Sequence, residues 1–261
     1  MNNKKRILID ANGVNYVNME DLTLNPLVFK EFYRLKKRVY VKYPKYDFFA
    51  IEGMNDYILK VLKTYEWVNC YEEMYVQKKF LLSKDNLKDI NLPLGYVLNK
   101  SRIVGQIIPY YKDSISFRNA SIGCSLDELM NIIKLDDDGL HNLFLIYHKI
   151  LNIIEEMYEK NVIYQDVHGG NFLFYHNDIK VVDFDYDYLF FYKNKLHLLN
   201  TFKNYIQMVN IINKEYHLPK FVFNSNVDDF NKMKSRLVKL ENVSRPIYKV
   251  KKYFEDQNNM K

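Results

Sequence analysis

The chain has 261 residues, of which 48% are hydrophobic and 27% charged, a composition typical of a globular protein and too apolar for an intrinsically disordered one. Its 38 basic and 32 acidic residues give a formal net charge of +6, a mild excess on a mixed surface. Such an excess suits anionic ligands such as nucleotides but does not by itself indicate nucleic-acid binding.

No apolar run approaches the ~20 residues that a membrane-spanning helix needs, and the first ten residues do not resemble a secretory signal. The only two cysteines, Cys70 and Cys124, lack the spacing of a metal site, so we expect reduced thiols. The sequence therefore predicts a soluble, cytoplasmic protein with no membrane segment.

Short strands dominate the expected structure of the first half of the chain. Runs rich in β-branched and aromatic residues, bounded by turn-forming residues, predict strands at 38–42, 48–51 and 57–62. The stretch 66–82 contains neither Pro nor Gly and carries apolar residues near helical spacing, which predicts a helix. Strands are expected again at 95–98 and 103–108, so the predicted order is three strands, one helix and two strands.

Helices dominate after residue 110. Ser125-Leu-Asp-Glu128 matches a capping box and predicts a short helix to about residue 133. Apolar residues recur at three- and four-residue steps between Leu143 and Tyr158, which predicts a long amphipathic helix. Further helices are expected near 198–213 and 228–241, and one before the strands, around 27–35.

These elements divide the chain into three expected parts. Residues 1–37 form an N-terminal extension, residues 38–110 a small strand-rich lobe, and residues 111–261 a mainly helical lobe. We therefore expect an α+β fold with two lobes, in which one helix accompanies a small antiparallel sheet.

A group of polar residues follows the long helix. Asn171 comes five residues after Asp166, with Gly169 and Gly170 allowing a tight backbone between them, and Asp183 ends an apolar strand. Phosphoryl transfer from a nucleotide needs a carboxylate that orients the acceptor, oxygen ligands for Mg²⁺, and a cation on the phosphates. One Asp and one Asn suffice for a magnesium ion that keeps several waters. Taken singly, each of these acids also fits an ordinary turn or strand end.

The joint pattern carries a resemblance to a known family. The segment 161–174, Asn-Val-Ile-Tyr-Gln-Asp-Val-His-Gly-Gly-Asn-Phe-Leu-Phe, resembles the catalytic loop of protein kinases and of their relatives, the aminoglycoside and choline kinases. Its Asp-x-His-x-x-Asn form is common in those relatives and in atypical protein kinases, and Val-Val-Asp-Phe-Asp at 181–185 resembles the magnesium-binding Asp-Phe-Gly. The match is specific over about residues 145–186 and is supported by element order over 38–186.

The resemblance implies a two-lobed protein-kinase-like fold and an ATP- and magnesium-dependent kinase that transfers the γ-phosphoryl group to a hydroxyl acceptor. Asp166 would be the catalytic carboxylate, and Asn171 and Asp183 would bind Mg²⁺. His168 would brace the loop by hydrogen bonding against the strand that bears Asp183. Lys60 resembles the lysine of the third kinase strand, which contacts the phosphates; its structural alternative is a lysine on an edge strand with its charged end in solvent.

The same resemblance implies two further contacts. A glutamate of the helix at 66–82 would pair with Lys60; Glu73 is preferred, and Glu72, on a neighbouring face, remains the alternative. Adenine would lie between the lobes, hydrogen-bonded to the backbone from Ile108 to Tyr110, with Leu173 below it.

Several features depart from the pattern of protein kinases. No Gly-x-Gly-x-x-Gly exists, so the loop that would hold the triphosphate is not identified. Tyr164 and Gln165 replace the usual His-Arg, which disfavours control by a phosphorylated activation loop. Asp185 replaces the Gly of Asp-Phe-Gly, and no Ala-Pro-Glu follows; both features lean toward the small-molecule kinases.

The class of acceptor stays open at this point. Loop context and strand order narrowly favour a protein serine/threonine kinase over a small-molecule phosphotransferase. A nucleotide-binding pseudokinase scaffold is a third alternative, because the glycine-rich loop is absent, although all four expected functional side chains are present. Nucleic-acid binding is not expected, since no element carries a basic stripe with interleaved aromatic residues.

Overall fold

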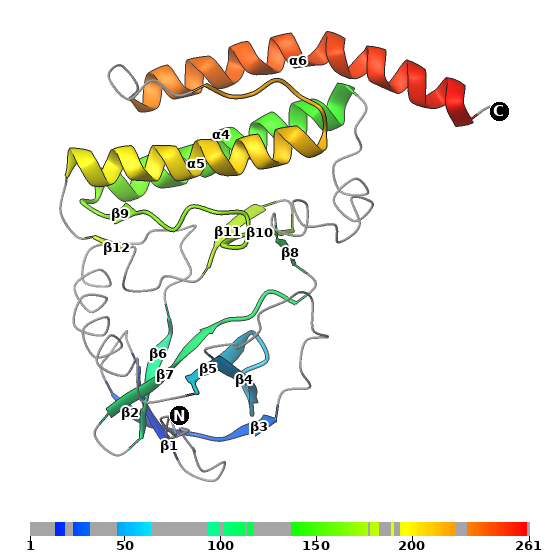
Figure 1. The fold of residues 1–261 in the computed structure, drawn as a ribbon. Helices are drawn as coiled ribbons and strands as arrows, with labels where there is room; N and C mark the ends of the chain where they lie inside the picture. The colour runs from blue at the N-terminus through cyan, green and yellow to red at the C-terminus, as the bar shows by residue number, and fades with distance from the viewer. Residues whose placement is uncertain are drawn as a thin grey trace, which may run out of the picture. The chain divides into compact units, whose positions relative to one another are not determined.

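The computed structural model describes residues 14–18, 23–31, 46–63, 93–99, 102–112, 114–116, 137–176, 178–182, 189–190, 194–222 and 229–259. The chain divides into two compact units, Met1–Lys112, here named the strand unit, and Asp113–Lys261, the helical unit. Together the units make a mixed α and β protein, with a large antiparallel sheet in the first and long helices in the second (Figure 1).

Seven strands form one antiparallel sheet in the described part of the strand unit. In chain order they are β1 (Val14–Asn18), β2 (Leu24–Leu27), β3 (Phe29–Glu31), β4 (Tyr46–Ile51), β5 (Tyr57–Leu62), β6 (Gly95–Asn99) and β7 (Arg102–Pro109). Their spatial order is β2-β1-β6-β7-β5-β4-β3. Strands β5 and β7 thus lie inside the sheet, and every residue from Ile58 to Leu62 is buried. A strand that is buried on both faces has a mostly apolar sequence, and this is why the sequence predicts β5.

One glycine fixes how closely β5 and β7 approach each other. A Cβ atom at Gly105 of β7 would lie 2.7 Å from the carbonyl oxygen of Lys60 on β5, a distance that side chains do not tolerate. Around this contact, apolar residues of β5, β6 and β7 form the core of the unit, among them Leu59, Val97 and Ile107. Lys60 pairs with Phe48 of β4 and with Gln106 of β7, so its backbone is held from both neighbouring strands.

The strands predicted at 48–51, 57–62, 95–98 and 103–108 are confirmed as β4 to β7. The helix expected around residues 27–35 is wrong where the structure describes it, because β2 and β3 cover residues 24–27 and 29–31. Strands β1 to β3 also join the same sheet as the rest of the unit, whereas the sequence suggested a separate extension over 1–37. The strand expected at 38–42 and the helix expected at 66–82 lie outside the described residues.

The missed strands are short and lie at the margins of the sheet. Strand β2 contains Pro26, which lacks a backbone N–H and is tolerated because β2 is an edge strand of the described sheet. Strand β3 has three residues and lies at the opposite edge. Such strands offer little alternation for a sequence-based assignment to detect.

The helical unit contains three long helices among its described residues: α4 (Asp137–Glu159), α5 (Lys195–Glu215) and α6 (Phe230–Asn259). The three helices run alongside one another (Figure 1). Helix α6 packs against α4, and α4 also contacts the small strands of the unit. The small strands form two short sheets, β11 (Asp178–Val181) with β10 (Phe172–Tyr175) and β8 (Ile115–Ser116), and β12 (Leu189–Phe190) with β9 (Ile163–Tyr164).

The helices predicted near 143–158, 198–213 and 228–241 are confirmed, with different ends. Helix α5 begins at Lys195 because the side chain of Asn194 accepts hydrogen bonds from the backbone N–H groups of Leu196 and His197. Helix α6 continues through Pro246 to Asn259. None of the described residues beyond Pro246 is buried, so this extension of the helix has no face packed in a core. The short helix expected at 125–133 lies outside the described residues.

Two buried tyrosines tie α4 to α5. The Tyr147 hydroxyl donates to Asn213 Oδ1 at 2.9 Å, and the Tyr205 hydroxyl donates to the carbonyl of Tyr147 at 2.8 Å. Burial raises the pKa of both phenols well above the ordinary value, so they remain protonated donors. The helix pair is therefore a rigid base for the segments that leave its ends.

A charged cluster joins α4 to α6. Glu241 of α6 lies 2.7 Å from His141 Nδ1 on α4 and accepts a hydrogen bond from Arg245 at 2.7 Å. Burial acts to raise the pKa of Glu241, but the hydrogen bonds from His141 and Arg245 outweigh it and hold the pKa below 4.5. Nearby on α4, burial lowers the pKa of His148 below 6.5.

Acid is therefore expected to weaken the contact between α4 and α6. A depressed carboxyl pKa stabilises the fold above pH 4.5 and loses that contribution as pH falls through the folded-state pKa. A depressed histidine pKa likewise costs stability as pH falls below 6.5, because the unfolded chain binds the proton more readily. We expect the melting temperature, followed by circular dichroism, to be level above pH 6.5 and to fall in two stages below it.

The substitution Glu241→Gln isolates the second stage. It should lower the free energy of unfolding by about 1 kcal/mol at neutral pH, since one partner of each hydrogen bond loses its charge. It should also flatten the decline below pH 4.5. A decline of unchanged steepness in Glu241→Gln would show that another carboxylate is responsible.

Candidate active site

The loop that carries the predicted catalytic residues begins where α4 ends. Asn161 adopts a left-handed backbone conformation with φ of 62°, which asparagine tolerates better than most residues. The chain reverses there, and the N–H of Val162 donates to the carbonyl of Met157 at 2.8 Å. Strand β9 follows, then the segment 165–171, here named the polar loop, and then β10.

The structure brings Asp166 and Asn171 of the polar loop together. The Asn171 amide nitrogen Nδ2 donates to Asp166 Oδ2 at 2.8 Å and to the Asp166 carbonyl at 3.1 Å. Its amide group is therefore oriented by the loop itself, and only 3% of Asn171 is exposed. Among the described residues, no donor bonds to Asn171 Oδ1. That oxygen remains available to a ligand.

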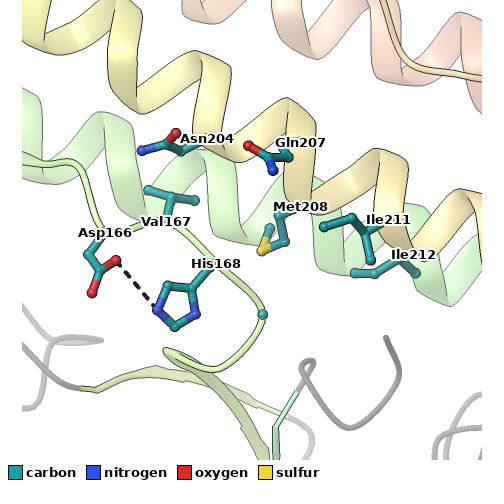
Figure 2. A pocket seen from close by; sticks show the side chains of 9 residues that line it. Asp166, Val167, His168, Asn204, Gln207, Met208, Ile211 and Ile212 are labelled. Atoms are coloured by element: carbon teal, nitrogen blue, oxygen red, sulfur yellow. Dashed lines mark ion pairs between the residues drawn. The ribbon is translucent and has the colours of Figure 1, made fainter. Parts of the chain in front are cut away.

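His168 does not make the contact expected of it. The N–H of Gly170 donates to His168 Nδ1 at 3.0 Å, and His168 Nε2 lies 3.4 Å from Asp166 Oδ1 (Figure 2). Both partners belong to the polar loop, so the expectation that His168 braces the loop against β11 is wrong. Because Nδ1 accepts, a neutral imidazole carries its proton on Nε2, facing the carboxylate.

Tyr164 makes the bracing contact instead. Its hydroxyl accepts from Asn171 Nδ2 at 2.7 Å and donates to the carbonyl of Val182 at 3.4 Å, while the N–H of Val182 donates to the Asn171 carbonyl at 2.8 Å. Val182 immediately precedes Asp183, which lies outside the described residues together with Asp185. Tyr164 thus links the polar loop to the end of β11.

Helix α5 holds the start of the polar loop through three polar side chains. Thr201 Oγ1 donates to the Tyr164 carbonyl at 3.0 Å, and Asn204 Nδ2 donates to the Gln165 carbonyl at 2.6 Å. Gln165 Nε2 lies 2.9 Å from Nδ1 of His197. These α5 residues recur at four- and three-residue steps on one face of the helix. That spacing predicts a shared helix face, but it does not indicate that this face contacts the polar loop.

A pocket of about 220 Å³ lies between the polar loop and α5 (Figure 2). Its walls come from these two segments, and the lining residues are Asp166, Val167, His168, Gly169, Asn204, Gln207, Met208, Ile211 and Ile212. The predicted catalytic carboxylate therefore borders a cavity that can admit a small group.

Lys60 is an interior residue of the strand unit. It is 4% exposed, and its ammonium lies 4.0 Å from the centroid of the Tyr46 ring, a cation–π contact. Since β5 lies between β4 and β7, the alternative of a lysine on an edge strand is excluded. Gln106 of β7 is directly opposite Lys60 in the sheet and points to the same face. Gln106 is 3% exposed, and its Nε2 has no hydrogen-bond partner among the described residues.

The expected adenine-binding positions fall in different units. Ile108 and Tyr110 lie at the end of β7 and just after it in the strand unit, and the Tyr110 N–H already donates to the carbonyl of Asp56 at 2.7 Å. Leu173 lies half-buried on β10 in the helical unit, opposite Lys180 and Ser116. Glu72 and Glu73, the candidate partners of Lys60, lie outside the described residues.

No protein-family model matches this sequence, and no curated protein matches it.

None of the described helices has the length and apolar character needed to cross a membrane. Within the described ranges there is also no group of three or more His, Cys, Asp or Glu side chains placed to hold a metal ion. The described part of the site thus offers a metal the oxygens of Asp166 and Asn171.

Removing the Tyr164 hydroxyl tests its bracing contact. Tyr164→Phe should lower the free energy of unfolding by about 1 kcal/mol, because Asn171 loses an acceptor and the Val182 carbonyl loses a donor in a buried setting. Urea unfolding monitored by fluorescence would measure the change. Tyr253→Phe on the exposed end of α6 is the matched control and should change nothing. Equal losses in the two variants would contradict the bracing role.

Proposed function

We propose that this protein is an ATP- and magnesium-dependent phosphotransferase that moves the γ-phosphoryl group to a hydroxyl acceptor. The observation that carries the proposal is the arrangement of Asn171, whose Nδ2 is committed to Asp166 while Oδ1 accepts from no described residue. An amide fixed in this way directs an oxygen, the ligand type that Mg²⁺ prefers, next to a carboxylate. Asn171 and Asp183 would hold the magnesium ion, which screens and orients the phosphates when bound.

In this proposal Asp166 is the catalytic carboxylate. As the acceptor oxygen bonds to the γ-phosphorus and the bond to the β–γ bridging oxygen breaks, Asp166 takes the proton that the hydroxyl releases. Two contacts fix its orientation before the reaction, one from Asn171 and one from His168. Preorganised geometry of this kind is the main contribution that a protein makes to phosphoryl transfer.

Lys60 supplies the cation for the phosphates in the same proposal. An ammonium is costly to bury, and this one lies on an interior strand that closely packed neighbours hold in place. A two-lobed protein-kinase-like fold is supported by the division into a strand unit and a helical unit. It is also supported by strand order: β3, β4 and β5 pair in chain order, and β7 and β6 then continue the sheet beyond β5.

The test is incubation of the purified full chain with γ-labelled ATP, with and without Mg²⁺. Label is followed on the protein itself, on protein substrates with serine and threonine, on small alcohols, and as released phosphate. Magnesium-dependent transfer to any of these supports the proposal. Magnesium-dependent nucleotide binding without any turnover would instead identify a pseudokinase scaffold, and absence of both would end the kinase assignment.

A further inference from the structure

The pocket beside Asp166 is built mainly by one face of helix α5. Asn204, Gln207, Met208 and Ile211 are spaced three, one and three residues apart, so their side chains leave the helix on the same side. In Figure 2 these side chains extend from α5 toward the polar loop, with Asp166 and His168 opposite them. The pocket is thus continuous with the proposed catalytic carboxylate.

The two ends of the pocket differ in polarity. Figure 2 shows Asp166 and Asn204 at one end and Ile211 and Ile212 at the other, with Gln207 and Met208 between them. Gln207 makes no hydrogen bond to a described residue, and Asn204 uses only its Nδ2, on the Gln165 carbonyl. Ile211 keeps 41% of its surface exposed. A group that fills the pocket meets amide donors and acceptors next to the carboxylate and an apolar wall farther away.

The charge of the described lining residues disfavours anions. No lysine or arginine lines the pocket among the described residues, and its only carboxylate is Asp166. A negatively charged group placed there would lose its hydration without gaining a cationic partner and would be repelled by Asp166. A neutral or positively charged group avoids both costs.

The volume of the pocket limits the size of the group. The volume of about 220 Å³ lies below the ~300–1,000 Å³ of sites for drug-sized ligands. The pocket therefore admits a compact molecule with a few carbon atoms and one or two polar groups.

We infer that this pocket is the acceptor subsite and that the acceptor is a compact, non-anionic alcohol with an apolar carbon skeleton. The inference rests on the proposed function, since it takes Asp166 as the residue that receives the acceptor's proton. The hydroxyl lies at Asp166, a polar substituent bonds to Gln207, and the carbon skeleton packs on Met208 and Ile211. The alcohol oxygen gains the phosphoryl group, ADP leaves, and the proton passes to Asp166 and then to solvent.

Three primary alcohols test the subsite with the full-length protein. Leucinol is cationic and apolar, serinol is cationic and polar, and glycerate is anionic and polar. Transfer of label from ATP should have a kcat/KM that falls in that order, with leucinol at least about tenfold above serinol, the usual effect of filling an apolar wall. Ile211→Asp should remove most of the preference for leucinol over serinol. Leu196→Asp, at an exposed position of the same helix outside the pocket, is the matched control and should retain it.

Failure of the inference can be separated from failure of the proposed function. If ATP is turned over but glycerate equals leucinol, or Ile211→Asp keeps the preference, or a serine-containing peptide is phosphorylated in place of leucinol, the subsite is assigned wrongly. If ATP is not turned over at all, the proposed function fails. The pocket is then tested by nuclear magnetic resonance of the Met208 methyl group. Leucinol at millimolar concentration should shift that resonance and glycerate should not, and no shift with leucinol would overturn the inference.

Discussion

Replacing Asp166 by asparagine is expected to lower the rate of the proposed phosphoryl transfer by about 10²–10⁴-fold and to leave the proposed nucleotide binding in place. Asparagine has the shape of aspartate, and its amide oxygen can still accept the hydrogen bond that Asn171 Nδ2 donates at 2.8 Å. It cannot accept the proton that the acceptor hydroxyl would release in the proposed reaction. The substitution therefore removes the chemistry and leaves the polar loop in place.

Single-turnover transfer of label measures the rate, and titration with a fluorescent ATP analogue measures binding. Asp138→Asn, at an exposed position on α4, is the matched control and should leave both quantities unchanged. An Asp166→Asn protein with wild-type turnover would remove Asp166 from the chemical step. Loss of binding together with turnover would instead indicate that Asp166 acts on the nucleotide.

The second large effect is expected at Lys60. Lys60→Met should reduce kcat/KM for ATP by about 10²–10³-fold, the loss usually seen when one preorganised charge or donor is removed from a transition state. Methionine has a similar length and can keep the packing against the Tyr46 ring, where the lysine ammonium now lies 4.0 Å from the ring centroid. The buried strand should therefore tolerate the change.

Steady-state kinetics with varied ATP would measure the effect of Lys60→Met, and circular dichroism would check the fold. Lys63→Met is the matched control, because Lys63 directly follows β5 and bonds at 3.1 Å to a partly exposed Asp47. The control should be indistinguishable from the wild type. Similar kinetics in the two variants would show that the buried lysine serves packing alone.

The sequence predicted those elements in which burial imposes a regular pattern of apolar residues. Strand β5 is buried on both faces and reads as an apolar run, and α4 has a wide apolar face. Strand β2 with Pro26 and the three-residue β3 lack that pattern, and they take their structure from neighbouring strands. The second half of α6 was not predicted, although Ile247, Val250 and Phe254 recur there at helical spacing; none of its described residues beyond Pro246 is buried.

The candidate site was predictable where its residues are close in the chain. Asp166 and Asn171 are five residues apart, and this spacing together with the preceding helix, the following strand and the second acid predicted that they act together. The supports from α5 come from residues more than 30 positions away, so no local rule connects Thr201 or Asn204 to the loop. Sequence also narrowly favoured a protein acceptor, and the compact pocket lined by α5 now favours a small alcohol within our proposal.

Asn204 has two roles in this arrangement. Its side chain holds the Gln165 carbonyl, one residue before Asp166, and it also lines the pocket. Under the proposed function, an acceptor that orders Asn204 would also bias the position of the loop. A loop ordered by metal and nucleotide would then favour the acceptor by the same factor, because linkage between two binding events is reciprocal. A single amide would thereby couple the affinity for each substrate to the presence of the other.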